Sequence, residues 1–377
     1  MTVLLRGVAE LYGRALAKPV VHKGELLSVQ RLRGLAVLMV LVVHVEDIAR
    51  KLPGWAGAHS DYARLIGYSA PDMFFVISGF IMSYITFNSR FEARRWLISR
   101  FFRIFPLYIF FTSLVVLLWL YNPAMTMGSG EHDWRSVSLS LLMLPQAELP
   151  LLFVGWTVEH ELVFYATVFL VARFLPLHWL MGVLLALSAL AFAKWGLKAY
   201  AGIQFWDFHL FSLYMSQFAI GALVYRFWGK SEALGWIPPL LGCGLLMCLG
   251  ALYSESGLIN QELPSRVLLF GGAYGLLLLA LLNLEKRQRA NGRQWHSRGP
   301  MVQMGDASYS IYLSHPFVLA LFGKLFSNVP LAPGLEVLLV ILSGVTVLAV
   351  GMATHLLLEK PIIEVGKRLA KPKPQNN

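Results

Sequence analysis

The first apolar stretch of the chain carries an arginine and a histidine on one side of a predicted helix. Arg33 and His44 are eleven residues apart, which places them within about 20° of the same face and roughly 16 Å apart along the axis. An ionisable side chain inside an apolar helix is costly and marks a candidate functional site. His44, with Glu46 and Asp47 just beyond it, predicts a general base, and the alternative is a histidine buried only for packing.

A second candidate lies in the segment W-T-V-E-H-E-L-V-F-Y, near the start of the apolar stretch 154–174. Glu159 and Glu161 are two residues apart and cannot share a helix face, whereas Glu161 and Tyr165 are one turn apart and do. We expect Glu161 about 10 Å inside the outer membrane edge, near the depth predicted for His44. A carboxylate at that depth would orient the imidazole and stabilise its charge.

Cations and hydroxyl groups gather near the opposite, inner end of the predicted helices. Arg100 and Arg103 are three residues apart and share a face where the third span begins. They suit either simple anchoring at the inner surface or a cradle for phosphate groups, and the sequence leaves both open. Ser308, Tyr312 and His315 form a polar stripe at i, i+4 and i+7 of another apolar helix.

Two layers of polar side chains are therefore predicted within the membrane. The inner layer holds cations and hydroxyls, and the outer layer holds a base and a carboxylate. A phosphate-bearing donor that enters from the cytoplasm and reacts at the outer layer fits this arrangement. A proton-coupled secondary transporter or flippase fits it as well, although the chain has no inverted repeat and no matching pair of Gly/Pro-broken helices.

The composition requires that these side chains be held by membrane helices. Of the 377 residues, 57% are hydrophobic and only 14% are charged, whereas soluble domains have about 45–50% apolar and 25% charged residues. The net charge of +11 is interpreted as topology rather than nucleic-acid binding. Cys243 and Cys248 share one apolar run and are expected to be packing residues, and no metal site is predicted.

Ten apolar runs are long enough to serve as spanning helices. The run Ser136–Leu149 is too short and is interrupted by prolines and polar residues, so it is expected to be re-entrant or interfacial. The fold class is therefore all-α, a polytopic membrane protein with about ten spans. The predicted spans are 34–50, 72–87, 104–121, 154–174, 177–194, 208–225, 235–253, 266–284, 307–326 and 335–357.

The distribution of lysine and arginine predicts that both termini are cytoplasmic. With the N-terminus inside, the inner segments hold 24 of the 32 basic residues, as the positive-inside rule requires. Residues 1–32 are expected to form a cytoplasmic, amphipathic and basic segment. No cleavable signal peptide is expected. Residues 362–377 are expected to form a basic cytoplasmic tail, disordered from Lys367 onward.

Six segments together resemble the acyltransferase 3 family of integral membrane acyltransferases, which includes exopolysaccharide and lipopolysaccharide O-acetyltransferases. Each segment is weak alone, but the six follow in the family's order from about residue 31 to 361. The chain has no fused esterase-like domain of the kind found in some members. The segments are R-G-L-A-V-L-M-V-L-V-V-H, D-M-F-F-V-I-S-G-F, R-F-F-R-I-F-P-L-Y, W-T-V-E-H-E-L-V-F-Y, D-A-S-Y-S-I-Y-L-S-H-P and E-K-P.

The resemblance implies roles for individual residues of a transmembrane acyltransferase domain over residues 33–361. His44 and Glu161 would be catalytic, with Glu161 polarising His44. The E-K-P segment contributes Glu359, which could equally form a salt bridge at a helix end. The residues that would bind the acyl-CoA donor are Arg33, Arg100, Arg103, Ser308, Tyr309, Tyr312 and His315.

The resemblance also implies the reaction and its location. An acyl group, usually acetyl, would pass from cytoplasmic acyl-CoA to a sugar hydroxyl of an exopolysaccharide, lipopolysaccharide or lipid-linked glycan. Acyl-CoA would be a co-substrate, with no bound cofactor, and the protein would lie in the bacterial inner membrane. The partners would be the donor, the glycan or glycolipid acceptor and membrane lipids, without nucleic acid.

Overall fold

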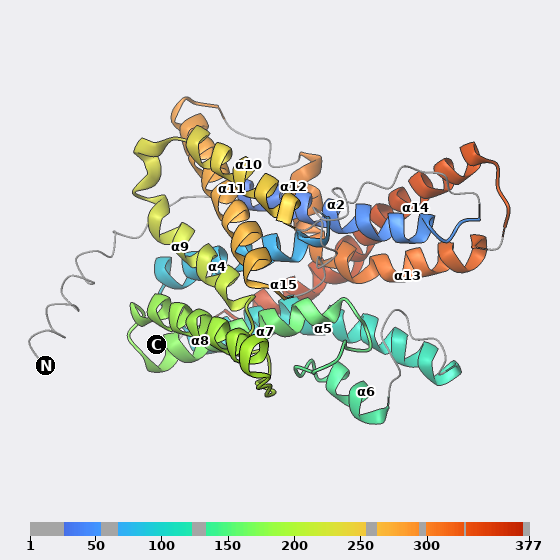
Figure 1. The fold of residues 1–377 in the computed structure, drawn as a ribbon, viewed down its shortest axis with the longest axis horizontal. Coiled ribbons are helices and arrows are strands. Elements are labelled where there is room, and N and C mark those ends of the chain that lie inside the picture. Colours follow the sequence, from blue (N-terminus) through green and yellow to red (C-terminus); the bar gives the residue numbers. More distant parts are fainter. Residues whose placement is uncertain are drawn as a thin grey trace, which may run out of the picture. The chain divides into compact units, whose positions relative to one another are not determined.

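The computed structural model describes residues 26–53, 67–122, 133–253, 262–293, 299–327 and 329–371, and all regular elements within these ranges are helical (Figure 1). The all-α prediction is therefore confirmed for this part of the chain. Residues 1–25, which hold most of the predicted N-terminal segment, lie outside it. In chain order the elements are α2 (Leu27–Ala49), α4 (Ala70–Asn88), α5 (Ala93–Tyr121), α6 (Trp134–Leu141), α7 (Gly155–Phe174), α8 (Trp179–Ala201), α9 (Met215–Trp228), η1 (Ser231–Leu234), α10 (Ile237–Tyr253), α11 (Pro264–Ala290), α12 (Pro300–Asp306), α13 (Ser308–Phe326), α14 (Pro333–Thr354), η3 (His355–Glu359) and α15 (Lys360–Leu369).

Several of these helices have the length and composition of membrane spans. Each of the ten predicted spans coincides with a helix, although the number of membrane crossings stays a prediction. Among the described residues, five helical stretches are long and apolar enough to cross a bilayer, as in a multi-pass membrane protein. They are Ala70–Asn88, Ala93–Tyr121, Trp179–Ala201, Pro264–Ala290 and Gly334–Leu369.

Several helix boundaries differ from the predicted spans by seven residues or more: α2 begins at Leu27, α8 ends at Ala201, and the starts of α5 and α9 are also displaced. Helix α5 already begins at Ala93, so the second half of the basic segment predicted as a loop extends the helix. Helix α9 begins only at Met215, not near residue 208. Phe208 and His209 have φ angles of 54° and 64°, and this left-handed backbone conformation cannot continue a right-handed helix.

The contacts divide the chain into two compact units. The first comprises the described residues up to Arg33, Pro71–Phe91 and His160–Val302, and the second comprises Gly34–Ala70, Glu92–Glu159 and the described residues from Gln303 onward. In the first unit α11 packs against α9 and α10, and α8 packs against α9. In the second unit α13 packs against α14, and α15 packs against α5.

A buried carboxylate of the first unit fixes the beginning of α2. Glu285 of α11 is 3% exposed and accepts hydrogen bonds from the backbone N–H groups of Leu27 (3.2 Å) and Ser28 (2.8 Å). The first N–H groups of a helix have no partner within it, and negative charge is favoured at that end. Glu285 therefore holds the start of the helix that carries Arg33 and His44.

Two glycines, Gly79 of α4 and Gly221 of α9, allow the backbones of these two helices of the first unit to touch. A Cβ atom at Gly79 would lie 2.1 Å from the carbonyl oxygen of Phe218 in α9, and one at Gly221 would lie 2.0 Å from that of Val76. Only glycine permits such an approach, as in other closely packed membrane helices. Gly79 and Gly221 therefore serve close helix packing.

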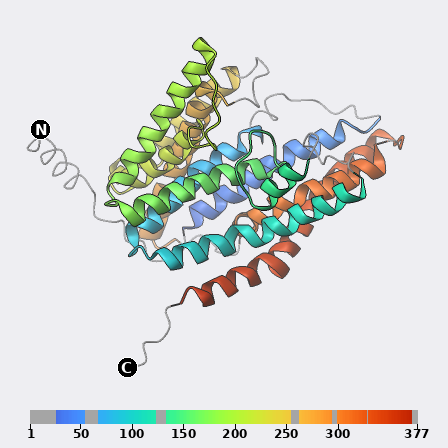
Figure 2. The same cartoon turned by 90° about the horizontal axis from the view of Figure 1, so that it is seen from below.

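The end of the chain is more ordered than its composition predicts. Helix α15 lies beside α5 (Figure 2), and a Cβ at Gly366 would come within 2.5 Å of Phe102. The guanidinium of Arg94 donates to the Leu369 carbonyl oxygen at 3.2 Å. The prediction of disorder is wrong for Lys367–Leu369, because these residues belong to α15, which packs on α5. Residues 372–377 lie outside the described part.

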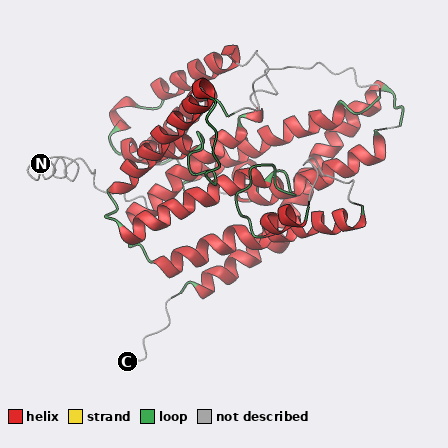
Figure 3. Cartoon of the chain, turned by 60° about the horizontal axis from the view of Figure 1, so that its bottom comes forward, coloured by secondary structure: helices red, strands yellow, loops and turns green. Residues whose placement is uncertain are grey.

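The run Ser136–Leu149 contributes only the eight-residue helix α6 followed by a loop (Figure 3). Eight residues rise about 12 Å, too little for a 30 Å hydrocarbon core, so the prediction that this run forms no spanning helix is confirmed. Asp133 caps α6 by accepting from the N–H of Ser136 at 2.7 Å. This hydrogen bond holds the pKa of the Asp133 carboxyl below its ordinary value.

Candidate active site

The second unit places His44 beside a carboxylate and a second imidazole. Nδ1 of His44 lies 3.6 Å from Oδ2 of Asp47, one turn further along α2. The His44 ring stacks on that of His315, with centroids 4.9 Å apart and planes 28° apart. The edge-on ring of Phe153 lies 5.8 Å away. His44 thus has a carboxylate toward one ring nitrogen, the arrangement that orients a general base.

The two acids that follow His44 have separate partners. Glu46 forms an ion pair with Arg50 at 2.9 Å on α2. Asp47 instead faces His44 and also accepts from the hydroxyl of Tyr68 at 3.4 Å. The sequence placed both acids near His44 without choosing between them, and the structure selects Asp47.

The tautomer of His315 is set by the proline that follows it. Pro316 lies inside α13 and has no N–H, so it cannot donate to the carbonyl oxygen of Tyr312, four residues earlier. Nδ1 of His315 lies 2.7 Å from that oxygen. Because a carbonyl oxygen only accepts, Nδ1 must carry the proton. Nε2 of His315 is then a bare acceptor, and it is buried with no hydrogen-bond partner among the described residues.

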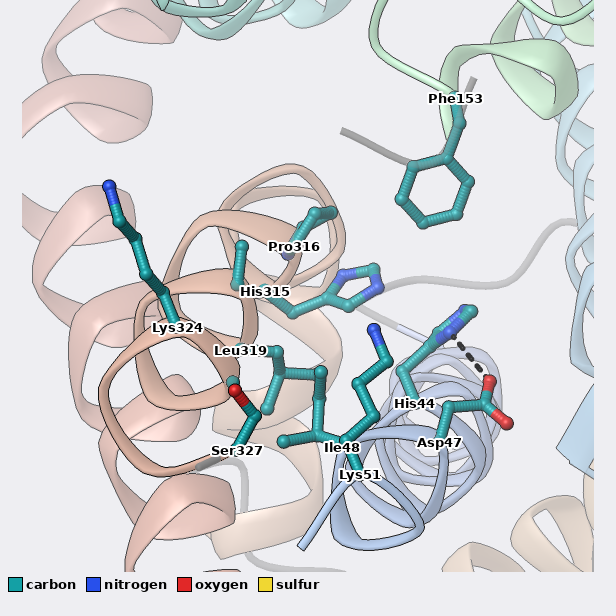
Figure 4. Close-up of a pocket in the computed structure, with 12 residues that line it drawn as sticks. His44, Asp47, Ile48, Lys51, Phe153, His315, Pro316, Leu319, Lys324 and Ser327 are labelled. Atoms are coloured by element: carbon teal, nitrogen blue, oxygen red, sulfur yellow. Dashed lines mark ion pairs between the residues drawn. The ribbon is translucent and has the colours of Figure 1, made fainter. Parts of the chain in front are cut away.

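A cavity of about 560 Å³ opens at these two histidines (Figure 4). Its volume lies within the range of about 300–1,000 Å³ of small-molecule sites. Its polar lining residues come from α2, from α13 and from the residues that directly follow these helices. The lining residues are His44, Asp47, Ile48, Lys51, Phe153, His315, Pro316, Leu319, Ala320, Gly323, Lys324 and Ser327.

The predicted polar stripe of α13 is buried inside the second unit. Ser308 and His315 are each 1% exposed. The hydroxyl of Tyr312 donates to the carbonyl oxygen of Val154 at 3.1 Å and accepts from Thr157 at 3.0 Å. Tyr312 therefore ties α13 to the beginning of α7, and its hydroxyl holds Phe153, the residue before Val154, near His44.

A separate ionic cluster of the second unit is centred on Glu359. Its carboxylate is 2% exposed and pairs with the guanidinium of Arg103 at 2.5 Å. It also accepts from Ser310 at 2.6 Å and lies 2.8 Å from Nδ1 of His355. The single π-helical turn η3 carries both His355 and Glu359, and such turns are frequent at functional sites.

The predicted donor-binding arginines of α5 have different surroundings. Arg103 is held by Glu359 and lies 5.9 Å from the ring of Tyr309. Tyr309 in turn donates to the carbonyl oxygen of Ile104 at 2.9 Å. Arg100, one turn earlier, is partly exposed and donates to the hydroxyl of Ser99 at 3.1 Å. The second unit thus brings Arg103 and Tyr309 together, with Arg100 on the same helix.

Glu161 and Arg33 belong to the first unit. Glu161 accepts from Tyr165 at 2.6 Å and from the hydroxyl of Ser78. Arg33 is a partly buried residue of α2. Glu159, which belongs to the second unit, accepts instead from the backbone and side chain of Gln146 at 3.3 and 3.4 Å. The two acids of this segment therefore have different partners, as their spacing predicted, and the pairing of Glu161 with His44 stays a prediction.

The first unit also holds a buried ion pair between two of its helices. Asp72 lies in the first turn of α4. It also pairs with Arg266 of α11 at 2.9 Å, with Asp72 0% and Arg266 9% exposed. Gln217 of α9 donates to the same carboxylate. This cluster joins three helices of the unit.

Several residues of the site were missed by the sequence analysis. Phe153 and Lys51 line the cavity, and Ser310 and His355 hold Glu359. The spacing of His355 and Glu359 at i and i+4 was an available signal, because it places both on one helix face. Among the described residues, no three histidine, cysteine or acidic side chains are placed to bind a metal ion.

We expect Pro316→Ala to stabilise α13 and weaken catalysis together. An alanine N–H would donate to the Tyr312 carbonyl and compete with Nδ1 of His315, while removal of an interior proline favours the helix by up to about 3 kcal/mol. Turnover in the reaction that the resemblance implies, and thermal unfolding of the purified variant, measure the two effects. Pro106→Ala in α5 is the control, with a gain in stability only. A Pro316→Ala enzyme with unchanged activity would contradict this role of the proline.

Comparison with known proteins identifies the family. A family model described as an acyltransferase domain, acyltransferase 3, matches residues 26–356. Over 314 residues the chain is 31% identical to the exopolysaccharide production protein ExoZ of Rhizobium meliloti (strain 1021), covering 80% of this chain and 91% of ExoZ. No solved structure matches the chain. Because the family match extends over most of the sequence, the chain belongs to the acyltransferase 3 family.

Proposed function

We propose that the protein transfers an acyl group, in particular acetyl, from acyl-CoA to a sugar hydroxyl of an exopolysaccharide. The observation that carries this proposal is the cavity in which His44 lies between Asp47 and the ring of His315. An acyltransferase must deprotonate a hydroxyl as it attacks, and a neutral imidazole is the usual base for that step.

The reaction follows from the roles that these groups can take. The Nε2 atom of His44 accepts the hydroxyl proton while the sugar oxygen attacks the thioester carbonyl carbon. The C–S bond then breaks, the ester forms, and the CoA thiolate takes up the proton. Asp47, near Nδ1, stabilises the positive charge on the ring. The bare Nε2 of His315 can accept a hydrogen bond from a neighbouring hydroxyl of the sugar and so orient the ring. Glu161 is a second proposed carboxylate that polarises His44.

The donor is proposed to bind from the cytoplasm at basic residues of the inner ends of the helices. Arg100 and Arg103 offer guanidinium groups that match phosphate geometry, and Arg103 is positioned for this by Glu359. Arg33, Ser308, Tyr309, Tyr312 and His315 complete the proposed donor path. This assignment agrees with a ten-span topology in which both termini are cytoplasmic.

The acceptor and the location are proposed from the relative. ExoZ is named an exopolysaccharide production protein, which supports a glycan acceptor and a place in the bacterial inner membrane. Acetyl-CoA is the proposed donor because acetyl is the usual acyl group in this family.

Labelled acetyl-CoA tests the proposal. Membranes containing the wild-type protein, incubated with [¹⁴C]acetyl-CoA and candidate glycans, should yield label in the glycan. Membranes with His44→Ala should not. Transport of glycan across the membrane without incorporation of label would instead indicate a transporter.

Arg100→Ala is expected to weaken use of the donor far more than use of the acceptor. Loss of a charge-assisted phosphate contact of about 1.5–3 kcal/mol should raise the KM for acetyl-CoA by roughly one to two decades. Arg100→Lys should restore part of the affinity, because a point charge lacks the planar fork. Arg95→Ala, on another face of α5, is the matched control. If the folded Arg100→Ala enzyme has an unaltered KM for the donor, Arg100 serves only to anchor the helix at the membrane surface.

A further inference from the structure

The cavity at His44 has two lysines among its lining residues. Lys51 follows the end of α2 by two residues, and Lys324 lies in the last turn of α13. Figure 4 shows the Lys51 side chain pointing toward the two imidazole rings, whereas Lys324 extends away from them. Ser327 adds a hydroxyl at the same end. The cavity therefore combines a catalytic base with two cations of the same unit.

Neither lysine has an acidic partner among the residues that the structure describes. Arg50, the residue before Lys51, behaves differently, since it pairs with Glu46 at 2.9 Å. Asp47, the carboxylate of the cavity, faces His44 instead. Two ammonium groups in one cavity repel each other, and a bound anion would relieve this repulsion.

The predicted topology gives no separate reason for these lysines. Positive residues are retained at the inner ends of membrane helices, but Lys51 belongs to a segment predicted to lie outside, and Lys324 lies near the outer end of the predicted span 307–326. Of the 32 basic residues, 24 lie in the predicted inner segments, and Lys51 and Lys324 are among the other eight. Their position on the cavity is therefore better explained by a ligand than by anchoring.

We propose that Lys51 and Lys324 bind an anionic group of the acceptor, so that the site prefers a glycan carrying a carboxylate to a neutral one. This inference rests on the proposed function and specifies its acceptor class. Lys51, nearer the imidazoles, would contact the anion of the sugar that reacts or of its neighbour. Lys324 would contact a more distant part of the chain. A cavity of about 560 Å³ has room for such a segment.

Equilibrium binding without donor tests this proposal independently of catalysis. The probes are a fluorescently labelled tetrasaccharide containing glucuronic acid and the same tetrasaccharide with its carboxyl groups reduced to alcohols. The full-length protein is placed in nanodiscs of phosphatidylcholine, and the measurement is repeated with added phosphatidylglycerol. We expect the acidic probe to bind about tenfold more tightly than the reduced probe, with a preference that falls as salt is raised.

The lysine variants assign the effect to these side chains. Lys51→Gln should remove most of the preference for the acidic probe. Lys324→Gln should reduce this preference by about threefold, and Lys51→Arg should keep it. Lys198→Gln, an exposed lysine of α8 outside the cavity, is the matched control and should bind like the wild type. Equal binding of the two probes in both kinds of nanodisc, as expected if the lysines serve only lipid headgroups, would overturn the proposal. So would no binding of either probe. Label transfer from acetyl-CoA, measured separately, reports on the proposed function itself.

Discussion

Replacement of His44 by glutamine is expected to lower turnover by about 10²–10⁴-fold, with expression and folding intact. Glutamine has a similar size and can form hydrogen bonds, so it would replace a histidine that served only packing. It cannot accept the hydroxyl proton, and loss of a general base has an effect of this size. The measurement is kcat for transfer of acetyl from acetyl-CoA to glycan. Near-normal turnover of His44→Gln would remove His44 as the base and make His315 the next candidate.

Two further variants show which carboxylate acts with His44. Asp47→Asn should lower kcat with little change in the donor KM. Combined with His44→Gln it should be little worse than His44→Gln alone, because residues that act as one unit are not additive. Glu161→Gln tests the other proposed carboxylate in the same way.

The second large effect concerns the ionic cluster at Glu359. Removal of one partner of a buried ion pair leaves an uncompensated charge and typically costs about 3–5 kcal/mol. We therefore expect Arg103→Ala and Glu359→Ala each to lower thermal stability strongly in detergent. The double variant Arg103→Met with Glu359→Leu should be more stable than either single variant, because it leaves no buried charge unpaired.

The KM for acetyl-CoA distinguishes a role of this cluster in donor binding from a purely structural role. If Glu359 positions Arg103 for the donor phosphates, the double variant should fold but show a raised KM for acetyl-CoA, while kcat changes less. Lys367→Gln removes the exposed ion pair with Glu364 and is the control, with little effect on stability. A double variant that is as unstable as the single variants would contradict the ion-pair explanation.

The sequence predicted the helices well because their signal is local. Apolar runs of sufficient length located ten helices, and the i, i+4, i+7 spacing located the polar stripe of α13. The local consequence of Pro316 was also predictable, since proline frees the carbonyl four residues earlier. The boundary of α9 was not, because Phe208 and His209 adopt a left-handed backbone that apolarity does not reveal.

Contacts between distant segments could not be predicted in the same way. Arg103 and Glu359 are 256 residues apart in the sequence, which indicated anchoring or phosphate binding for Arg103 but not its pairing with Glu359. Phe153 belongs to a loop without any pattern, and it reaches His44 only because Tyr312 holds the neighbouring backbone. The stacking of His44 on His315 depends on how α2 and α13 fold together, which helical periodicity does not specify.

The most direct test of acyl transfer at the His44 cavity is the stoichiometry of the reaction in a purified system. The full-length protein in nanodiscs is incubated with [¹³C]acetyl-CoA and exopolysaccharide, and free CoA thiol and labelled ester are measured together. We predict one CoA released for each ¹³C-acetyl ester formed on a sugar hydroxyl, with both products lost in His44→Gln. Ester formation that is unaffected by His44→Gln, or wild-type protein that forms no ester and releases no CoA, would contradict it.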